Sequence, residues 1–307
     1  MTRARKVQVS LSDTPYYHLI SRCVRRAFLC GKLGKKSFEH RRQWLVDRIE
    51  FLASTFSIDI CSYAIMSNHY HLVIKVDSTR DWDDKQVLSA WASLYQLPML
   101  CDRFMKGEFM CKAELVVVHQ IIEQYRKRLM DLSWFMKCLN EHIAHMANKE
   151  DGCTGCFWEG RFKSQALLDE RALLTCMAYV DLNPIRAAMA TTPEDSDYTS
   201  IQARIENKDS WLLGFSDDDI PYYLTDYVAL VDYTGRAQLA NKRGSIPNDI
   251  PDVFTRLNLD PNSWLDELKK FKSKGRTAVG TVAQLKQFCK RMKAKWLVTN
   301  ILTPALE

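Results

Sequence analysis

Two histidines separated by one residue are the strongest chemical signal in the chain. His69 and His71 lie in the segment Met66-Ser-Asn-His-Tyr-His-Leu-Val-Ile74, whose composition favours a β-strand. Side chains alternate between the two faces of a strand, so both histidines point one way and Tyr70 points the other. Two imidazoles on one face can bind one divalent metal ion. The spacing predicts half of a metal site, with two ordinary surface or core histidines as the alternative.

A tyrosine and an asparagine four residues apart could complete such a site. Tyr179 and Asn183 would share one face of a helix. The phenol could act as a nucleophile, and the amide oxygen could be a hard ligand for Mg²⁺ or Mn²⁺ alongside imidazole. The alternatives are a packed core aromatic for Tyr179 and a helix C-cap for Asn183.

The elements that must position these residues begin with three strands and one helix. Aromatic, β-branched and apolar residues are spaced as expected for strands at 16–22, 58–66 and 69–76, and for a helix within 38–56. The resulting β-α-β-β order is half of a ferredoxin-like α+β sandwich.

Helices dominate the following region. Residues 82–148 carry apolar residues at helical spacing, and residues 157–168 predict a turn and a fourth strand. Asp169 and Glu170 are acidic residues suited to the positive end of a helix, which should end before Pro184. Residues from 251 onward predict helix and are basic, after a stretch rich in Gly, Pro, Asn and Ser at 241–251.

Composition sets the broad class of the protein. The chain has 307 residues, of which 47% are hydrophobic and 26% are charged, as in ordinary globular proteins. We expect no membrane segment, because no apolar run approaches ~18 residues. The basic N-terminus lacks an apolar region after it, so a secretory signal is not expected. Ten scattered cysteines fit a reducing cytoplasm better than a disulfide framework.

A second group of residues has side chains that could bind a metal. Cys138, His142, His145, Cys153 and Cys156 fall within nineteen residues and have side chains that bind zinc. The same segment has the pattern of a packed helix, which needs no metal.

Basic residues suggest a polyanionic partner. The formal net charge is +6, which permits such a partner without requiring one. Six residues near the predicted strands and the tyrosine helix are candidates for phosphate contacts. They are Arg22, Arg25, Arg26, Arg161, Lys163 and Arg186. Solvated surface charge is the alternative for each of them.

Four segments in order resemble one family. They are Tyr16–Arg22, Met66–Ile74, Phe157–Ser164 and Tyr179–Met189, and together they resemble the REP-associated tyrosine transposases of the single-tyrosine HUH superfamily. The resemblance implies a ferredoxin-like sandwich with a central antiparallel sheet over about residues 10–200. Residues 78–130 would be a long helical insertion in a transposase domain at 1–200. The composition changes beyond about residue 200, and residues 201–307 are expected to be a mostly helical, basic accessory region.

The resemblance also implies a reaction. His69 and His71 would bind Mg²⁺ or Mn²⁺ with Asn183 as a third ligand, and Tyr179 would be the catalytic tyrosine. The substrate would be single-stranded or hairpin DNA from palindromic repeats, cut and rejoined through a 5′-phosphotyrosine by a monomer or homodimer. The chain departs from the family at Arg22-Cys-Val-Arg-Arg26, where relatives often carry an Arg-Gly-Asn-type run, so substrate contacts there are in doubt.

Two other functions remain open at this stage. One is a domesticated DNA-binding protein of the same fold without catalysis. The other is a metal-dependent phosphodiesterase that uses water, with Tyr179 only structural. The formation or absence of a covalent tyrosine adduct separates these three possibilities.

Overall fold

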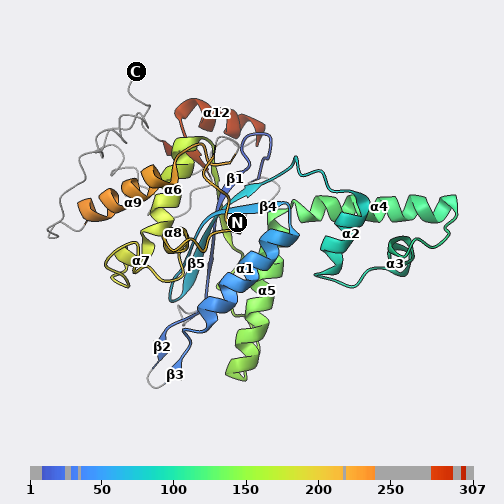
Figure 1. Ribbon diagram of the computed structural model, residues 1–307, viewed down its shortest axis with the longest axis horizontal. Coiled ribbons are helices and arrows are strands. Elements are labelled where there is room, and N and C mark those ends of the chain that lie inside the picture. Colours follow the sequence, from blue (N-terminus) through green and yellow to red (C-terminus); the bar gives the residue numbers. More distant parts are fainter. Residues whose placement is uncertain are drawn as a thin grey trace. The chain divides into compact units, whose positions relative to one another are not determined.

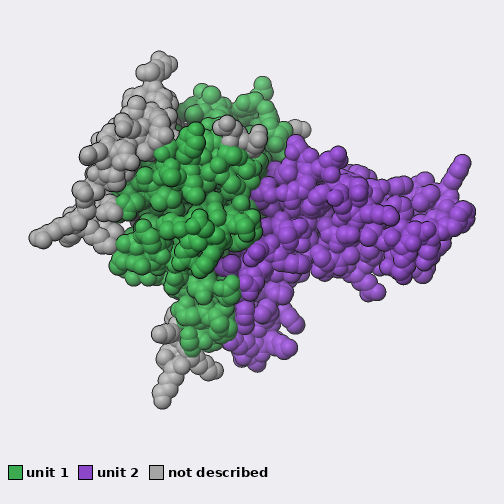
Figure 2. Space-filling model, viewed as in Figure 1, with its two compact units in different colours: residues 1–43, 60–75, 158–307 green, residues 44–59, 76–157 purple. Residues whose placement is uncertain are grey.

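The computed structural model describes residues 9–24, 29–33, 36–216, 219–238, 278–292 and 299–301. Within these residues the chain is a mixture of helices and strands (Figure 1). It divides into two compact units, coloured separately in Figure 2. Unit 1 comprises residues 1–43, 60–75 and 158–307, and unit 2 comprises residues 44–59 and 76–157. None of the described helices is long and apolar enough to cross a membrane.

A mixed sheet carries the candidate residues. Its four principal strands are β1 (Tyr16–Arg22), β4 (Ile58–Ile65), β5 (His69–Val76) and β6 (Lys163–Leu167). Their order across the sheet is β4-β5-β1-β6, and β1 is antiparallel to both β5 and β6. This arrangement confirms the predicted α+β fold with a central antiparallel sheet.

The sequence pattern places these strands accurately because their buried residues are strongly β-favouring. β1 begins and ends at the predicted residues, and β5 covers the predicted range 69–76. A tight turn at Ser67 and Asn68 joins β4 to β5, closed by a hydrogen bond from Met66 N to His69 O at 2.8 Å. The turn fixes which residues of β5 lie on each face of the sheet.

Two strands of the C-terminal region were not predicted. β7 (Ala278–Gly280) pairs parallel with β6, and β8 (Thr299–Ile301) pairs parallel with β7. Helix α12 (Val282–Arg291) lies between them in sequence. The prediction of helix from residue 251 onward is therefore wrong at these two strands, which are too short to show a clear alternation. Residues 251–277 lie outside the described part of the chain.

Helices follow β6 and pack on one face of the sheet. α6 (Glu170–Asp181) is succeeded by the short α7 (Asn183–Arg186), by α8 (Ser200–Ile205) and by α9 (Leu224–Gln238). The buried cluster combines α6 residues such as Leu173 and Met177 with Val73 of β5 and Leu230 of α9. Gly235 allows close packing of α9, because a Cβ atom there would lie 3.2 Å from Leu182 Cδ2.

Unit 2 is helical, as the sequence predicts for residues 82–148. It contains most of α1 (Arg41–Thr55), together with α2 (Asp84–Ala92), α3 (Met99–Met105), α4 (Lys112–Leu129) and α5 (Leu132–Asp151). Trp91 of α2 stacks on Tyr125 of α4 with ring centroids 4.3 Å apart.

The remaining strands, β2 (Lys32–Leu33) and β3 (Lys36–Ser37), form a separate antiparallel pair in unit 1. The division of the chain into domains at residue 200 stays a prediction.

Candidate active site on the histidine face of the sheet

His69 and His71 share one face of β5, as their spacing predicts. Their ring centroids are 4.9 Å apart. Tyr70 points to the opposite face, where it is fully buried and meets Trp158 edge to face at 5.7 Å. Trp158 is itself buried, so this indole packs in the core and is not presented to bases. The strand therefore separates the apolar packing of Tyr70 from the polar face that carries the imidazoles.

A third histidine, which the sequence did not single out, joins this pair. His18 lies on β1, and its Nε2 atom is 2.9 Å from His71 Nδ1. The two rings stack with centroids 5.2 Å apart, and both residues are only 3% exposed. The sequence gives little indication that His18 belongs to the site. His18 reaches His71 only because β1 and β5 pair in the register that places Ile20 opposite His71.

Tyr179 of α6 faces the histidines. Its ring meets His71 at a centroid distance of 5.8 Å and His18 at 6.1 Å, with its plane steeply inclined to both. The helix that presents it begins at Asp169, whose side chain accepts a hydrogen bond from Ala172 N at 2.7 Å. This cap satisfies one of the free amides at the helix start. The fold thus brings Tyr179 next to His71, although the two residues are far apart in the sequence.

The phenol of Tyr179 is in a mixed electrostatic environment. Burial raises the pKa of Tyr179, whereas the charges of Arg186 and Arg22 lower it. The Arg186 guanidinium lies over the Tyr179 ring, with its carbon 5.0 Å from the ring centroid. Burial lowers the pKa of Arg186 to about 10. A nucleophilic tyrosine needs help to lose its proton, and the neighbouring cations act in that direction.

Asn183 is the first residue of α7 and not, as predicted, part of the helix that carries Tyr179. Its Nδ2 atom donates to the Tyr179 carbonyl oxygen at 3.0 Å. This contact is the C-capping role that was the alternative for this residue. This hydrogen bond uses the amide nitrogen of Asn183. The side-chain oxygen is therefore the atom through which Asn183 could bind a metal.

The two β5 histidines have the protonation and anchoring that metal ligands need. His69 Nδ1 is 2.6 Å from Asn68 Oδ1. His71 Nε2 is buried and has no hydrogen-bond partner among the described residues. Burial lowers the pKa of His69 to about 4, with a smaller effect of Arg22, and lowers that of His71 well below its ordinary value. Both imidazoles are neutral near pH 7, as ligation requires.

Histidines alone do not complete a metal site. In the described part of the chain, no group of three or more His, Cys, Asp or Glu side chains is arranged to hold a metal ion. A cation at His69 and His71 would need further oxygen ligands, from Asn183, from water or from a phosphate. The binding of Mg²⁺ or Mn²⁺ at these residues stays a prediction.

The predicted phosphate-binding residues differ in their placement. Arg22 is directly opposite His69 in the β1–β5 register, and Arg186 packs on Tyr179, so both lie at the histidine face. Arg161 and Lys163 are exposed on the segment that leads into β6. Arg25 and Arg26 lie outside the described residues.

Within the described residues, the cysteines and histidines between positions 138 and 156 are not arranged to hold a metal ion. Cys138 is buried with its Sγ 3.4 Å from the Tyr95 hydroxyl oxygen, whereas Cys153 and Cys156 are exposed. Cys153 Sγ contacts Asn148 Oδ1 at 3.6 Å. The segment behaves as the packed helix of the alternative interpretation.

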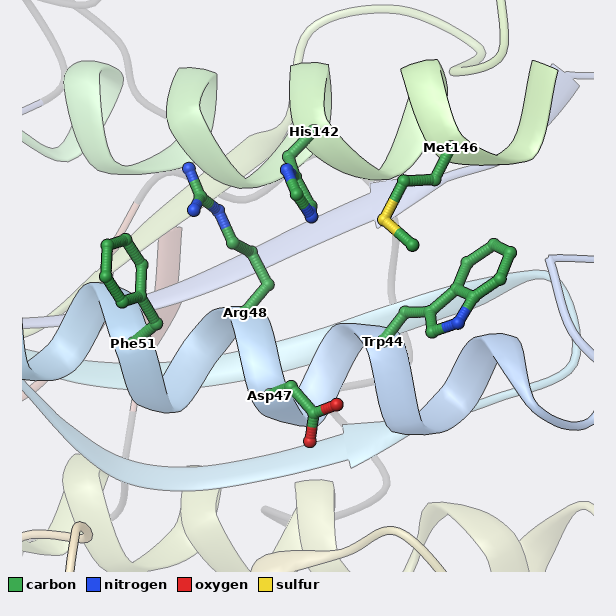
Figure 3. Close-up of a pocket in the computed structure, with 6 residues that line it drawn as sticks. All are labelled: Trp44, Asp47, Arg48, Phe51, His142 and Met146. Carbon is green, nitrogen blue, oxygen red and sulfur yellow. The ribbon is translucent and has the colours of Figure 1, made fainter. Parts of the chain in front are cut away.

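Unit 2 contains a separate cleft of about 240 Å³ between α1 and α5. Figure 3 shows Trp44, Arg48 and Phe51 reaching from α1 towards His142 and Met146 of α5. Arg48 also lies within 3.4 Å of the Cys138 carbonyl oxygen. The cleft holds none of the residues of the histidine face, and we assign no chemistry to it.

Comparison with known proteins finds one relationship, at the level of structure. No family model and no curated protein sequence matches the chain. A solved structure of a REP-associated tyrosine transposase bound to a REP hairpin is similar over 73% of this chain and 96% of its own chain. The two are 12% identical and superpose with a TM-score of 0.41.

Proposed function

We propose that this protein is a DNA strand transferase that uses Tyr179 as its nucleophile and a divalent metal ion, Mg²⁺ or Mn²⁺, at His69 and His71. The observation that carries the proposal is the approach of the Tyr179 ring to His71 and His18 across the sheet face. A tyrosine, two neutral imidazoles and an arginine at one place are the groups that phosphoryl transfer to a protein side chain needs. The resemblance of four sequence segments to REP-associated tyrosine transposases supports the same reaction.

The reaction follows from the chemistry of the phenol. The Tyr179 oxygen attacks the phosphorus in line with the leaving 3′ oxygen. A bond forms between Tyr179 and the phosphate, the bond to the 3′ oxygen breaks, and the phenol loses its proton while the 3′ oxygen gains one. The product is a 5′-phosphotyrosine, which a 3′-hydroxyl of another strand can attack to rejoin DNA. This reversal conserves the energy of the phosphodiester.

The residues of the site divide the remaining tasks. His69 and His71 would hold the cation, with Asn183 as the proposed third ligand. When bound, the cation would supply Lewis-acid polarisation of the phosphate. Arg186 favours the phenolate of Tyr179 by its charge. Arg22, Arg161 and Lys163 are proposed to contact the DNA backbone, because phosphate contacts provide most of the affinity for nucleic acid.

The proposed substrate is single-stranded or hairpin DNA. The Tyr179 ring is largely buried against the histidines, so the scissile phosphate must reach the site on an exposed, flexible strand. A strand in a continuous duplex is less free to bend into such a site. Palindromic repeats would supply strands that fold into hairpins.

The test is a cleavage assay with a labelled hairpin oligonucleotide and Mn²⁺. The wild-type protein should form a covalent adduct that resists denaturation, and Tyr179→Phe should form none. Tyr222→Phe is the matched control, since Tyr222 lies near the surface of the same unit and contacts Glu170 at 3.5 Å. An adduct formed equally by Tyr179→Phe would overturn the assignment.

A domesticated DNA-binding protein without catalysis is the second candidate. Two observations favour it. The Asn183 side chain hydrogen-bonds to the Tyr179 carbonyl oxygen, which is a structural role. Burial raises the pKa of Tyr179, which makes its phenol a weaker nucleophile. Metal-independent binding of the hairpin without cutting would support this candidate. Metal-dependent cutting that survives Tyr179→Phe would instead indicate hydrolysis by water.

A further inference from the structure

His18 is the residue that the proposed reaction leaves without a role, although it touches two members of the site. Its Nε2 atom lies 2.9 Å from His71 Nδ1, and its ring meets the Tyr179 ring. At 3% exposure, it is too buried to contact DNA directly. Any role of His18 must therefore pass through the residues it contacts, and its hydrogen bond is to His71.

The hydrogen-bonding partner on the other side of His18 is Gln165 of β6. The two residues are directly opposite in the β1–β6 register, so their side chains lie on the same face. The Gln165 side chain hydrogen-bonds to the His18 ring. The side chains of Gln165, His18 and His71 therefore form a row across β6, β1 and β5.

The direction of the hydrogen bonds along this row can be worked out. A neutral imidazole has one N–H donor and one bare nitrogen acceptor. If His18 donates to Gln165, its Nε2 atom is bare and must accept from His71 Nδ1–H. His71 Nε2 is then left bare, and it is the buried atom without a partner among the described residues. In the opposite direction, that atom would carry an unpaired buried hydrogen, which is costly.

The geometry points to His18 and Gln165 as positioning residues that hold His71 in the Nδ1–H tautomer, with its Nε2 lone pair ready to bind a cation. The inference rests on the proposed function for the identity of that cation, and it deepens the site without adding a ligand. His69 is anchored in the same way, because its Nδ1 atom bonds to Asn68 Oδ1 at 2.6 Å. Both β5 histidines would thus present Nε2, each oriented by a different neighbour.

The tautomer can be measured without any metal. The full chain, labelled with ¹⁵N-histidine and treated with a chelator, would be studied by long-range ¹H–¹⁵N correlation. His71 is assigned by the signal lost in His71→Asn. We expect the Nδ1–H tautomer in the wild type and in His18→Gln, whose amide can replace the Nε2 acceptor. In His18→Leu the preference should be lost. An Nε2–H tautomer in the wild type would overturn the inference.

Metal affinity gives an independent measurement. Titration calorimetry with Mn²⁺ should show about tenfold weaker binding, or worse, for His18→Leu, the usual effect of removing a partner that orients a ligand. His18→Gln should restore the affinity to within about threefold, and Gln165→Leu should weaken it less than His18→Leu. Leu19→Ala is the control for destabilisation, since Leu19 is buried on the opposite face of the same strand. Its Mn²⁺ affinity should equal that of the wild type.

The outcomes separate this inference from the proposed function. If the wild type binds no Mn²⁺ and forms no adduct, the proposed function fails, while the metal-free tautomer still decides the role of His18. If the wild type binds Mn²⁺ and forms the adduct but His18→Leu binds Mn²⁺ equally well, the positioning role is wrong and the proposed function stands. Loss of affinity in His18→Leu with recovery in His18→Gln supports both.

Discussion

The Tyr227 hydroxyl donates a hydrogen bond of 2.5 Å to Asp181 Oδ2 in the fully buried core of unit 1. Asp181 ends the helix that carries Tyr179, and Tyr227 belongs to α9 in the C-terminal part of the chain. The second carboxyl oxygen of Asp181 accepts from Ser200 Oγ at 2.5 Å and from Ile201 N at 3.1 Å. The end of the tyrosine helix is therefore held by residues from α8 and α9.

Removal of the Tyr227 hydroxyl should destabilise the protein without changing its shape. Tyr227→Phe leaves a buried carboxyl oxygen without its donor, which costs about 1–3 kcal/mol of the free energy of unfolding. Urea denaturation measures this loss. Tyr222→Phe is the matched control, because its hydroxyl contact with Glu170 is exposed and long at 3.5 Å. Equal stability of the two variants would show that the Asp181 network contributes little.

The cap of α6 should depend on hydrogen bonding more than on charge. Asp169→Ala removes the acceptor for Ala172 N and should lower the free energy of unfolding by about 1 kcal/mol. Asp169→Asn keeps an acceptor and should stay close to the wild type. Chemical denaturation at neutral pH compares the two variants. A larger loss in the asparagine variant would contradict this assignment.

The buried carboxyl group of Asp169 should make the stability of the protein depend on pH. Burial raises the pKa of Asp169 above the ordinary value of 3.8, so the folded protein binds this proton more tightly than the unfolded chain. The contribution of Asp169 to stability is then greatest below 3.8 and falls as the pH rises through the raised value. Asp169→Asn removes this titration, so its stability should fall less between acid and neutral pH. An unchanged slope in denaturation series would argue against the shift.

Metal binding should stabilise the folded protein through the β5 histidines. A cation present at a hundred times its Kd adds about 2.7 kcal/mol to the free energy of unfolding when it binds only the folded state. Denaturation with and without Mn²⁺ should show this gain in the wild type and its loss in His69→Asn and His71→Asn. His119→Asn serves as the control, because His119 is exposed and bonds to Asp84 on α2. A gain retained by His71→Asn would exclude this site.

The charge of Arg186 should favour the reaction of Tyr179. Because that charge lowers the pKa of the phenol, Arg186→Gln should leave less phenolate near pH 7. We therefore expect the initial rate of adduct formation to fall in Arg186→Gln. Arg186→Lys should recover part of the rate, and circular dichroism would verify folding. A rate unaffected by Arg186→Gln would assign Arg186 to packing alone.

Local sequence was sufficient for the parts of the site that depend on one element. The alternation on β5 predicted that His69 and His71 face away from Tyr70, and the spacing of Tyr179 and Asn183 predicted a shared face of one helix. The first prediction is confirmed, because side-chain direction follows from the period of a strand. The second is wrong in detail, because α6 ends at Asp181 and Asn183 begins α7, although its side chain still reaches the Tyr179 carbonyl oxygen. Strand and helix boundaries near the site were predicted well for the same reason.

Contacts between elements required the tertiary structure. His18 was not predicted as part of the site, since its bond to His71 depends on the pairing of Ile20 with His71 across two strands that are fifty residues apart. The strands β7 and β8 were not predicted, because a strand of three residues carries almost no periodicity.

The sequence by itself determined which groups could do chemistry and on which face of each element they lie. The tertiary structure decided which of those groups meet, that a third histidine contacts one of them, and that residues of the C-terminal part of the chain hold the end of the tyrosine helix. The physical reason is that direction along an element is set by local backbone geometry, whereas register and packing are set by the burial of residues distant in the chain.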